Sequence, residues 1–114
     1  MKKYIASLIA FAILATFIGC TEEPPSVRVY NERASNANVQ VKSSEGNTIN
    51  LNNVEPGMTT NYQNISEGRS ESTAVIQNES VSPTTTFTAV NNYNYTIIIA
   101  NTTPPTLKID SHSK

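Results

Sequence analysis

Groups that could perform acid–base or nucleophilic chemistry are scarce in this chain. Its 114 residues contain one histidine, His112, one aspartate, Asp110, and one cysteine, Cys20. His112 stands among the last four residues, where no third group can orient it against a nucleophile. The other carboxylates are glutamates, most of them in turn-like surroundings. We therefore predict no catalytic residue, no metal site and no cofactor, and a protein that is not an enzyme.

The tyrosines are the main candidates for binding. Tyr30, Tyr62 and Tyr93 could contact a sugar or a peptide, because a phenol ring offers both a flat apolar surface and a hydroxyl group. Residue parity places Tyr93 on the same strand face as Ile97 and Ile99, which favours packing at the edge of the core instead. Both interpretations of the tyrosines stay open at the level of sequence.

The first twenty residues indicate export. Lys2 and Lys3 precede an uncharged run of fifteen residues, from Tyr4 to Ile18, and the chain turns polar directly after Cys20. A membrane-spanning helix needs about 20 apolar residues, so this run is too short to cross a bilayer. It has the length and the positively charged start of a secretory signal peptide.

The end of the apolar run, Phe17-Ile18-Gly19-Cys20, resembles the lipobox of bacterial lipoproteins. Phe17 stands where that family usually has leucine. The resemblance implies a lipoprotein signal peptide over residues 1–19, cleavage before Cys20, acylation of its thiol (for example by palmitate), and a membrane anchor through the N-terminal lipid. Thr21, rather than aspartate, favours the outer membrane if the organism is Gram-negative. The alternative is an ordinary signal peptide in which Cys20 is incidental.

The composition from Cys20 onward predicts an all-β domain. Of those 95 residues, 28 are Val, Ile or Thr, which disfavour helices and suit strands. The full chain has a net charge of −1 and no basic cluster, which argues against nucleic-acid binding. Apolar residues alternate with polar ones in several short runs, as in strands with one buried face. Tyr95–Ala100 instead has apolar residues on both faces, which predicts a central strand covered on both sides. The alternating runs are Val27–Val29, Val39–Val41, Ile49–Leu51 and Leu107–Ile109.

Turn signals separate these runs. Ser44–Asn47 predicts a hairpin loop, Pro56-Gly57 has the order of a type II turn, and Asn91-Asn92 can supply a left-handed residue. The spacing predicts a single antiparallel sandwich of about seven to eight short strands after an N-terminal signal helix. We expect a linker over residues 20–26, the sandwich over 27–110, and a disordered tail over 111–114.

The order of several segments resembles the immunoglobulin-like sandwich domains of unknown function found in bacterial lipoproteins. These segments are Val27–Asn31, Asn38–Val41, Tyr62 before Ser66–Gly68, and Tyr93–Ile98. The resemblance implies a fold and a place in the cell envelope rather than a reaction. We expect a structural, accessory or recognition role with an envelope protein or a glycan as partner; the alternative is a carbohydrate-binding or adhesive module presenting surface tyrosines.

Overall fold

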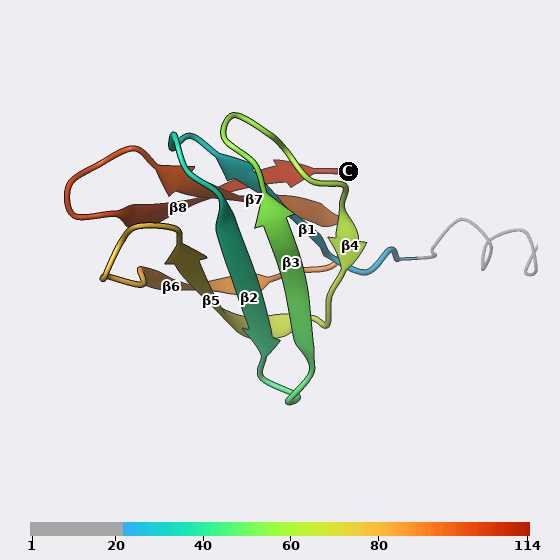
Figure 1. Ribbon diagram of the computed structural model, residues 1–114. Helices are drawn as coiled ribbons and strands as arrows, with labels where there is room; N and C mark the ends of the chain where they lie inside the picture. The colour runs from blue at the N-terminus through green and yellow to red at the C-terminus, as the bar shows by residue number, and fades with distance from the viewer. Residues whose placement is uncertain (1–21) are drawn as a thin grey trace, which may run out of the picture.

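The computed structural model describes residues 22–114, and their regular structure consists of eight strands (Figure 1). The segment predicted to be a signal peptide and the predicted lipidation site Cys20 lie outside these residues. No helix long and apolar enough to span a bilayer occurs in the described part. The strands are β1 (Ser26–Asn31), β2 (Ala37–Ser43), β3 (Thr48–Val54), β4 (Gln63–Asn64), β5 (Gly68–Ile76), β6 (Thr84–Ala89), β7 (Tyr93–Ala100) and β8 (Thr106–Ser113).

The strands form two four-stranded sheets that face each other as a sandwich, which confirms the predicted fold class. One sheet has the order β4-β1-β7-β8 and the other β3-β2-β5-β6. All pairs are antiparallel except β1 with β7, which run parallel from Ser26 opposite Asn94 to Asn31 opposite Ile99. The first sheet is therefore mixed rather than purely antiparallel. A parallel pair needs a long crossover, and here β2 to β6 supply it.

Alternation along the strands builds the core, as the sequence predicts. Ile97 and Ile99 on β7 are fully buried, as are Val27 and Val29 on the neighbouring β1. Tyr95 is also buried, and its ring packs 5.1 Å from that of Phe87 on β6. Coverage of β7 on its second face is only partial, because Ile98 on that face is half-buried.

The predicted turns have the backbone that their residues favour. Gly57 has a φ of 73°, and the Met58 amide donates to the Glu55 carbonyl at 3.0 Å, closing the Pro-Gly turn. Asn92 has a φ of 69° between β6 and β7. The loop Ser44–Asn47 joins β2 to β3, where Gly46 has a φ of 92°. These three connections are confirmed.

Two segments differ from the prediction at the ends of the domain. β8 continues to Ser113, so residues 111–113 are a strand paired with Tyr93 to Tyr95 and not a disordered tail. The sandwich also begins earlier than residue 27. The amide of Glu23 donates to the Asn92 side chain at 3.0 Å, and Lys114 Nζ donates to the Pro24 carbonyl at 2.7 Å. The two ends of the domain therefore lie side by side (Figure 1).

Candidate functional site

The outward side of the β4-β1-β7-β8 sheet carries a group of charged, aromatic and hydroxyl side chains around a shallow depression. Strand register places Arg28, Thr96 and Asp110 in one row across β1, β7 and β8. Tyr30, Ile98 and Lys108 form the next row. We call this surface the Arg28 face; it comprises Arg28, Tyr30, Tyr62, Thr96, Ile98, Lys108, Asp110 and His112.

Arg28 is held in place by two neighbours. Its Nε donates to Thr96 Oγ1 at 3.0 Å, and its Cζ lies 4.6 Å from the centroid of the Tyr62 ring. A guanidinium over an aromatic face is attracted by the ring quadrupole, so Tyr62 fixes the plane of the group. The two terminal nitrogens of Arg28 have no hydrogen-bond partner within residues 22–114. They form a pre-oriented fork that can bind an anion with two hydrogen bonds.

The Arg28 face carries a shallow depression with a volume of about 310 Å³. Its volume is close to that of another hollow on the sandwich, which has about 260 Å³. Arg28, Tyr30, Asp110 and His112 line the depression together with Thr59, Thr96 and Ile98. No hydrogen bond within the described residues joins His112 to Asp110 or to a hydroxyl group. The depression thus combines aromatic rings, one cation, one carboxylate and hydroxyl groups, which suits binding of a polar ring-shaped molecule.

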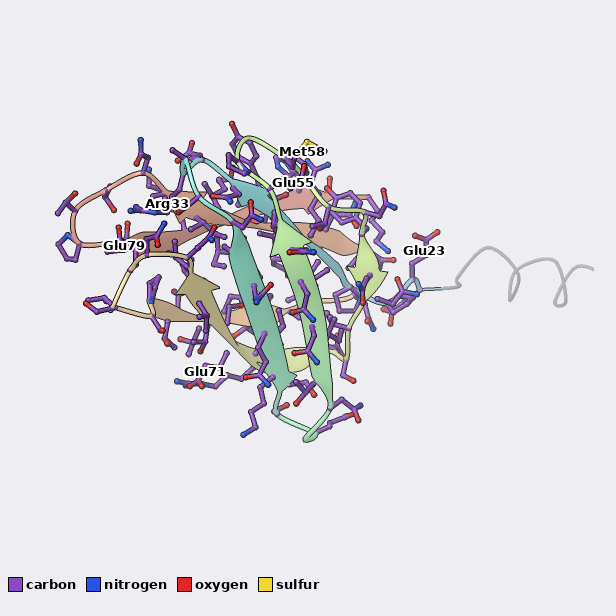
Figure 2. The ribbon with its side chains drawn as sticks, viewed as in Figure 1. Glu23, Arg33, Glu55, Met58, Glu71 and Glu79 are labelled. Carbon is purple, nitrogen blue, oxygen red and sulfur yellow. The ribbon has the colours of Figure 1, made fainter. Side chains whose placement is uncertain are left out.

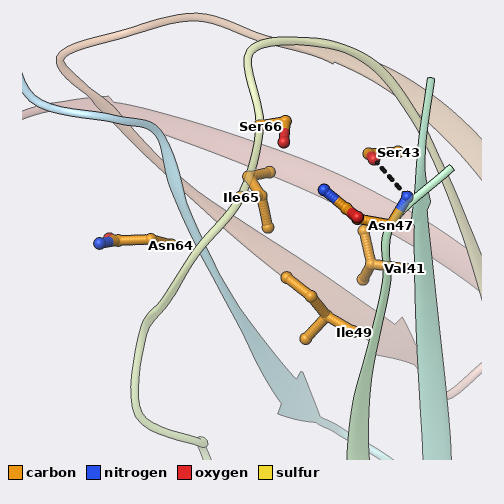
Figure 3. Close-up of a pocket in the computed structure, with 7 residues that line it drawn as sticks. All are labelled: Val41, Ser43, Asn47, Ile49, Asn64, Ile65 and Ser66. Atoms are coloured by element: carbon orange, nitrogen blue, oxygen red, sulfur yellow. Dashed lines mark hydrogen bonds between the residues drawn. The ribbon is translucent and has the colours of Figure 1, made fainter. Parts of the chain in front are cut away.

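A second hollow of about 260 Å³ lies where the edges of the two sheets meet (Figure 3). Val41, Ile49 and Ile65 provide its apolar part, and the rim is formed by Ser43, Asn47, Asn64 and Ser66. The Asn47 amide donates to Ser43 Oγ at 3.2 Å within that rim. β3 and β4 do not pair here, so this hollow is the open side of the sandwich core. It contains no charged group.

Arg33 organises the end of the sandwich that lies away from Glu23. Its side chain is only 10% exposed and joins Glu79 at 2.8 Å, as Figure 2 shows. The same guanidinium donates to the carbonyls of Ala100 and Thr102 at 3.0 and 2.9 Å. Because most of its donors are occupied by the protein, Arg33 ties three loops together and offers little to a ligand.

The structure places the sequence-predicted residues on different surfaces. Tyr30 and Tyr62 share the Arg28 face, and Tyr62 is 39% exposed. Tyr93 is 40% exposed but belongs to the inward-facing row of β7, so it does not join them. Arg28 was not selected from sequence, although its position between Val27 and Val29 already assigns it to the outward side. Cys20 lies outside the described residues, which contain no cluster of three metal-ligating side chains.

No protein-family model and no curated protein matches this sequence. Among solved structures, the chain is similar to an NMR structure of a protein from Eubacterium rectale, with a TM-score of 0.58. The two are 13% identical, and the match covers 84% of this chain and 93% of the other. At this identity the similarity extends to the β-sandwich fold alone.

Proposed function

We propose that this protein is a lipid-anchored component of the bacterial cell envelope whose sandwich recognises a partner without catalysing a reaction. The observation that carries the recognition role is Arg28, oriented by Thr96 and Tyr62 with its terminal donors free of protein partners. The immunoglobulin-like family and the outer-membrane location, which applies if the organism is Gram-negative, belong to the same proposal.

The contacts of Glu22 and Glu23 support close attachment to a membrane. Glu23 is bound through Asn92, and the Glu22 carboxylate accepts from Asn91 Nδ2 at 3.0 Å. From Cys20 to Glu23 the chain can therefore extend by at most about 11 Å, at roughly 3.6 Å per residue. A lipid on Cys20 would hold the sandwich beside the headgroups, which suits an accessory role in an envelope assembly.

The second candidate function is a carbohydrate-binding module, favoured by the exposure of Tyr62 next to Arg28. An exposed aromatic ring flanked by planar donors is a surface on which a sugar can stack and form hydrogen bonds. It differs from the first candidate only in the chemical class of the partner.

Membrane fractionation tests the anchoring. Cys20→Ser should release the protein from membranes or leave it unprocessed, because the thiol that carries the lipid is lost while more than one acyl chain is needed for stable anchoring. Thr21→Ser is the matched control and should remain in the membrane fraction. Equal membrane retention of correctly cleaved Cys20→Ser protein would contradict the lipoprotein assignment.

A further inference from the structure

We propose that the Arg28 face binds an acidic sugar, a pyranose that carries a carboxylate, through the free fork of Arg28. This inference rests on the recognition role proposed above and names its ligand class. A planar guanidinium presents two parallel N–H donors that match the two oxygens of a carboxylate. Tyr62 covers one side of the guanidinium, and Thr96 occupies Nε, so the terminal edge is the part that remains for a ligand.

Asp110 sets the orientation of that ligand. It lies in the same row as Arg28, two strands away, which corresponds to about 9–10 Å between their Cα atoms. A carboxylate close to Asp110 would be repelled, whereas hydroxyl groups can donate to it. The ligand must therefore present an anionic end to Arg28 and hydroxyl groups to Asp110. Thr59 and Thr96 add further hydroxyl partners along the depression.

A peptide fits this place less well than a sugar. Arg28 belongs to β1, which is paired with β4 on one side and β7 on the other. Peptides that bind sheets by strand addition need a free edge with unpaired backbone groups, and the edge strand on the β7 side is β8, two strands away from Arg28. An inner strand offers only side chains, and here these are aromatic rings and fixed polar groups. Such a surface is suited to a compact ring with many hydroxyl groups.

The experiment is an NMR titration of the full chain in detergent micelles with D-glucuronate, its methyl ester and D-glucose. The ester keeps the ring and removes the charge. We expect glucuronate to shift the amide signals of Arg28, Thr96 and Asp110, with at least about tenfold weaker binding of the ester and of glucose. Arg28→Gln should weaken glucuronate binding by a similar factor, and Arg28→Lys should recover it only in part because lysine has no fork.

Arg69→Gln is the matched control, since Arg69 is an exposed arginine on the outward side of the other sheet. It should leave glucuronate binding unchanged. Equal binding of glucuronate and its ester would overturn carboxylate recognition while keeping a sugar site. Tighter binding of a triglutamate peptide than of glucuronate would replace the sugar by an acidic peptide. Absence of binding to any of these molecules, with normal membrane retention of the wild type, would reject this ligand and leave the envelope anchor standing.

Discussion

The two outward surfaces of the sandwich each belong to a four-stranded sheet, but they hold an arginine differently. On the Arg28 face, the guanidinium of Arg28 is held between a threonine hydroxyl and a tyrosine ring. On the outward side of β3-β2-β5-β6, Arg69 is exposed and no hydrogen bond of its side chain occurs within residues 22–114. We call this second surface the amide face; its outward residues include Asn38, Gln40, Lys42, Thr48, Asn50, Arg69, Glu71, Thr73, Val75, Thr84, Thr86 and Thr88.

The two arginines differ in how firmly the protein orients their side chains. The amide face also has a hollow of about 300 Å³, lined in part by Lys42, Arg69 and Glu71. Size and charge therefore do not distinguish the two surfaces. What differs is the fixed orientation on the Arg28 face, since ordering a long side chain before binding removes an entropy cost of about 0.5–1.5 kcal/mol from the binding step.

The largest expected effect comes from the core that supports both faces. Ile97→Ala should lower the free energy of unfolding by about 2–5 kcal/mol, because Ile97 is fully buried and its truncation leaves a cavity. A small domain has a total stability of about 5–15 kcal/mol, so this loss is a large fraction of it and weakens the support of both faces. Urea denaturation followed by circular dichroism measures the change.

Ile98→Ala is the matched control for this substitution. Ile98 is the next residue on β7, lies on the Arg28 face and is half-buried. Its truncation should cost clearly less than that of Ile97. Equal losses for the two variants would show that the core does not lie between the two sheets.

Sequence alternation predicts the inward residues of most strands but gives no sign of β5. This strand lies between β2 and β6, yet three of the four buried residues that it turns inward are small, Ser70, Ser72 and Ala74, and only Ile76 at its end is large and apolar. The exposed Val75 points outward. A hydrophobicity pattern cannot reveal a strand whose buried side consists mostly of small residues. The neighbour of Ser70 on β6 is Phe87, whose ring packs on Tyr95. Small residues next to large ones fill the core without an apolar signal in β5.

The Arg28 face shows a second limit of prediction from sequence, because its residues come from strands that are far apart in the chain. Parity assigns Arg28 and Tyr30 to the outward side of one strand, and this much is visible in the sequence. The meeting of Arg28 with Thr96 and Asp110 depends on a parallel β1–β7 pair that forms over 60 residues apart in the chain. Local patterns do not specify which strands become neighbours, so the row could not be predicted.

The second largest effect concerns the C-terminal end of β8, which belongs to the sheet that carries the Arg28 face. Deleting Ser111–Lys114 should lower the free energy of unfolding by about 1–3 kcal/mol, because hydrogen bonds between β7 and β8 and the contacts of Lys114 are lost. The deletion also removes His112 from the Arg28 face and leaves the amide face intact. Thermal unfolding of the truncated chain measures the loss.

Lys114→Met separates the contribution of the Lys114 contacts from that of the hydrogen bonds between β7 and β8. The substitution keeps an apolar side chain and removes the ammonium group. Lys114 Nζ donates to Pro24 and Ser26 and lies 3.5 Å from a Glu23 carboxylate oxygen. We expect this variant to lose about 0.5–1.5 kcal/mol, less than the deletion. If the deletion left the free energy of unfolding unchanged, the result would support the disordered tail over residues 111–114 that the sequence predicts.

The smallest expected effect tests the difference between the faces directly. A double-mutant cycle of Arg28→Ala and Tyr62→Ala should give a coupling energy of about 0.5–1 kcal/mol, the usual value for an exposed cation over an aromatic ring. The matched cycle on the amide face uses Lys42→Ala and Glu71→Ala, which stand opposite each other on β2 and β5 without an ion pair within 4.0 Å. Its coupling should be near the lower limit for exposed charges, about 0.2 kcal/mol. If chemical denaturation gave equal couplings on both faces, Arg28 would be no better oriented than an ordinary surface charge, and the distinction between the faces would fail.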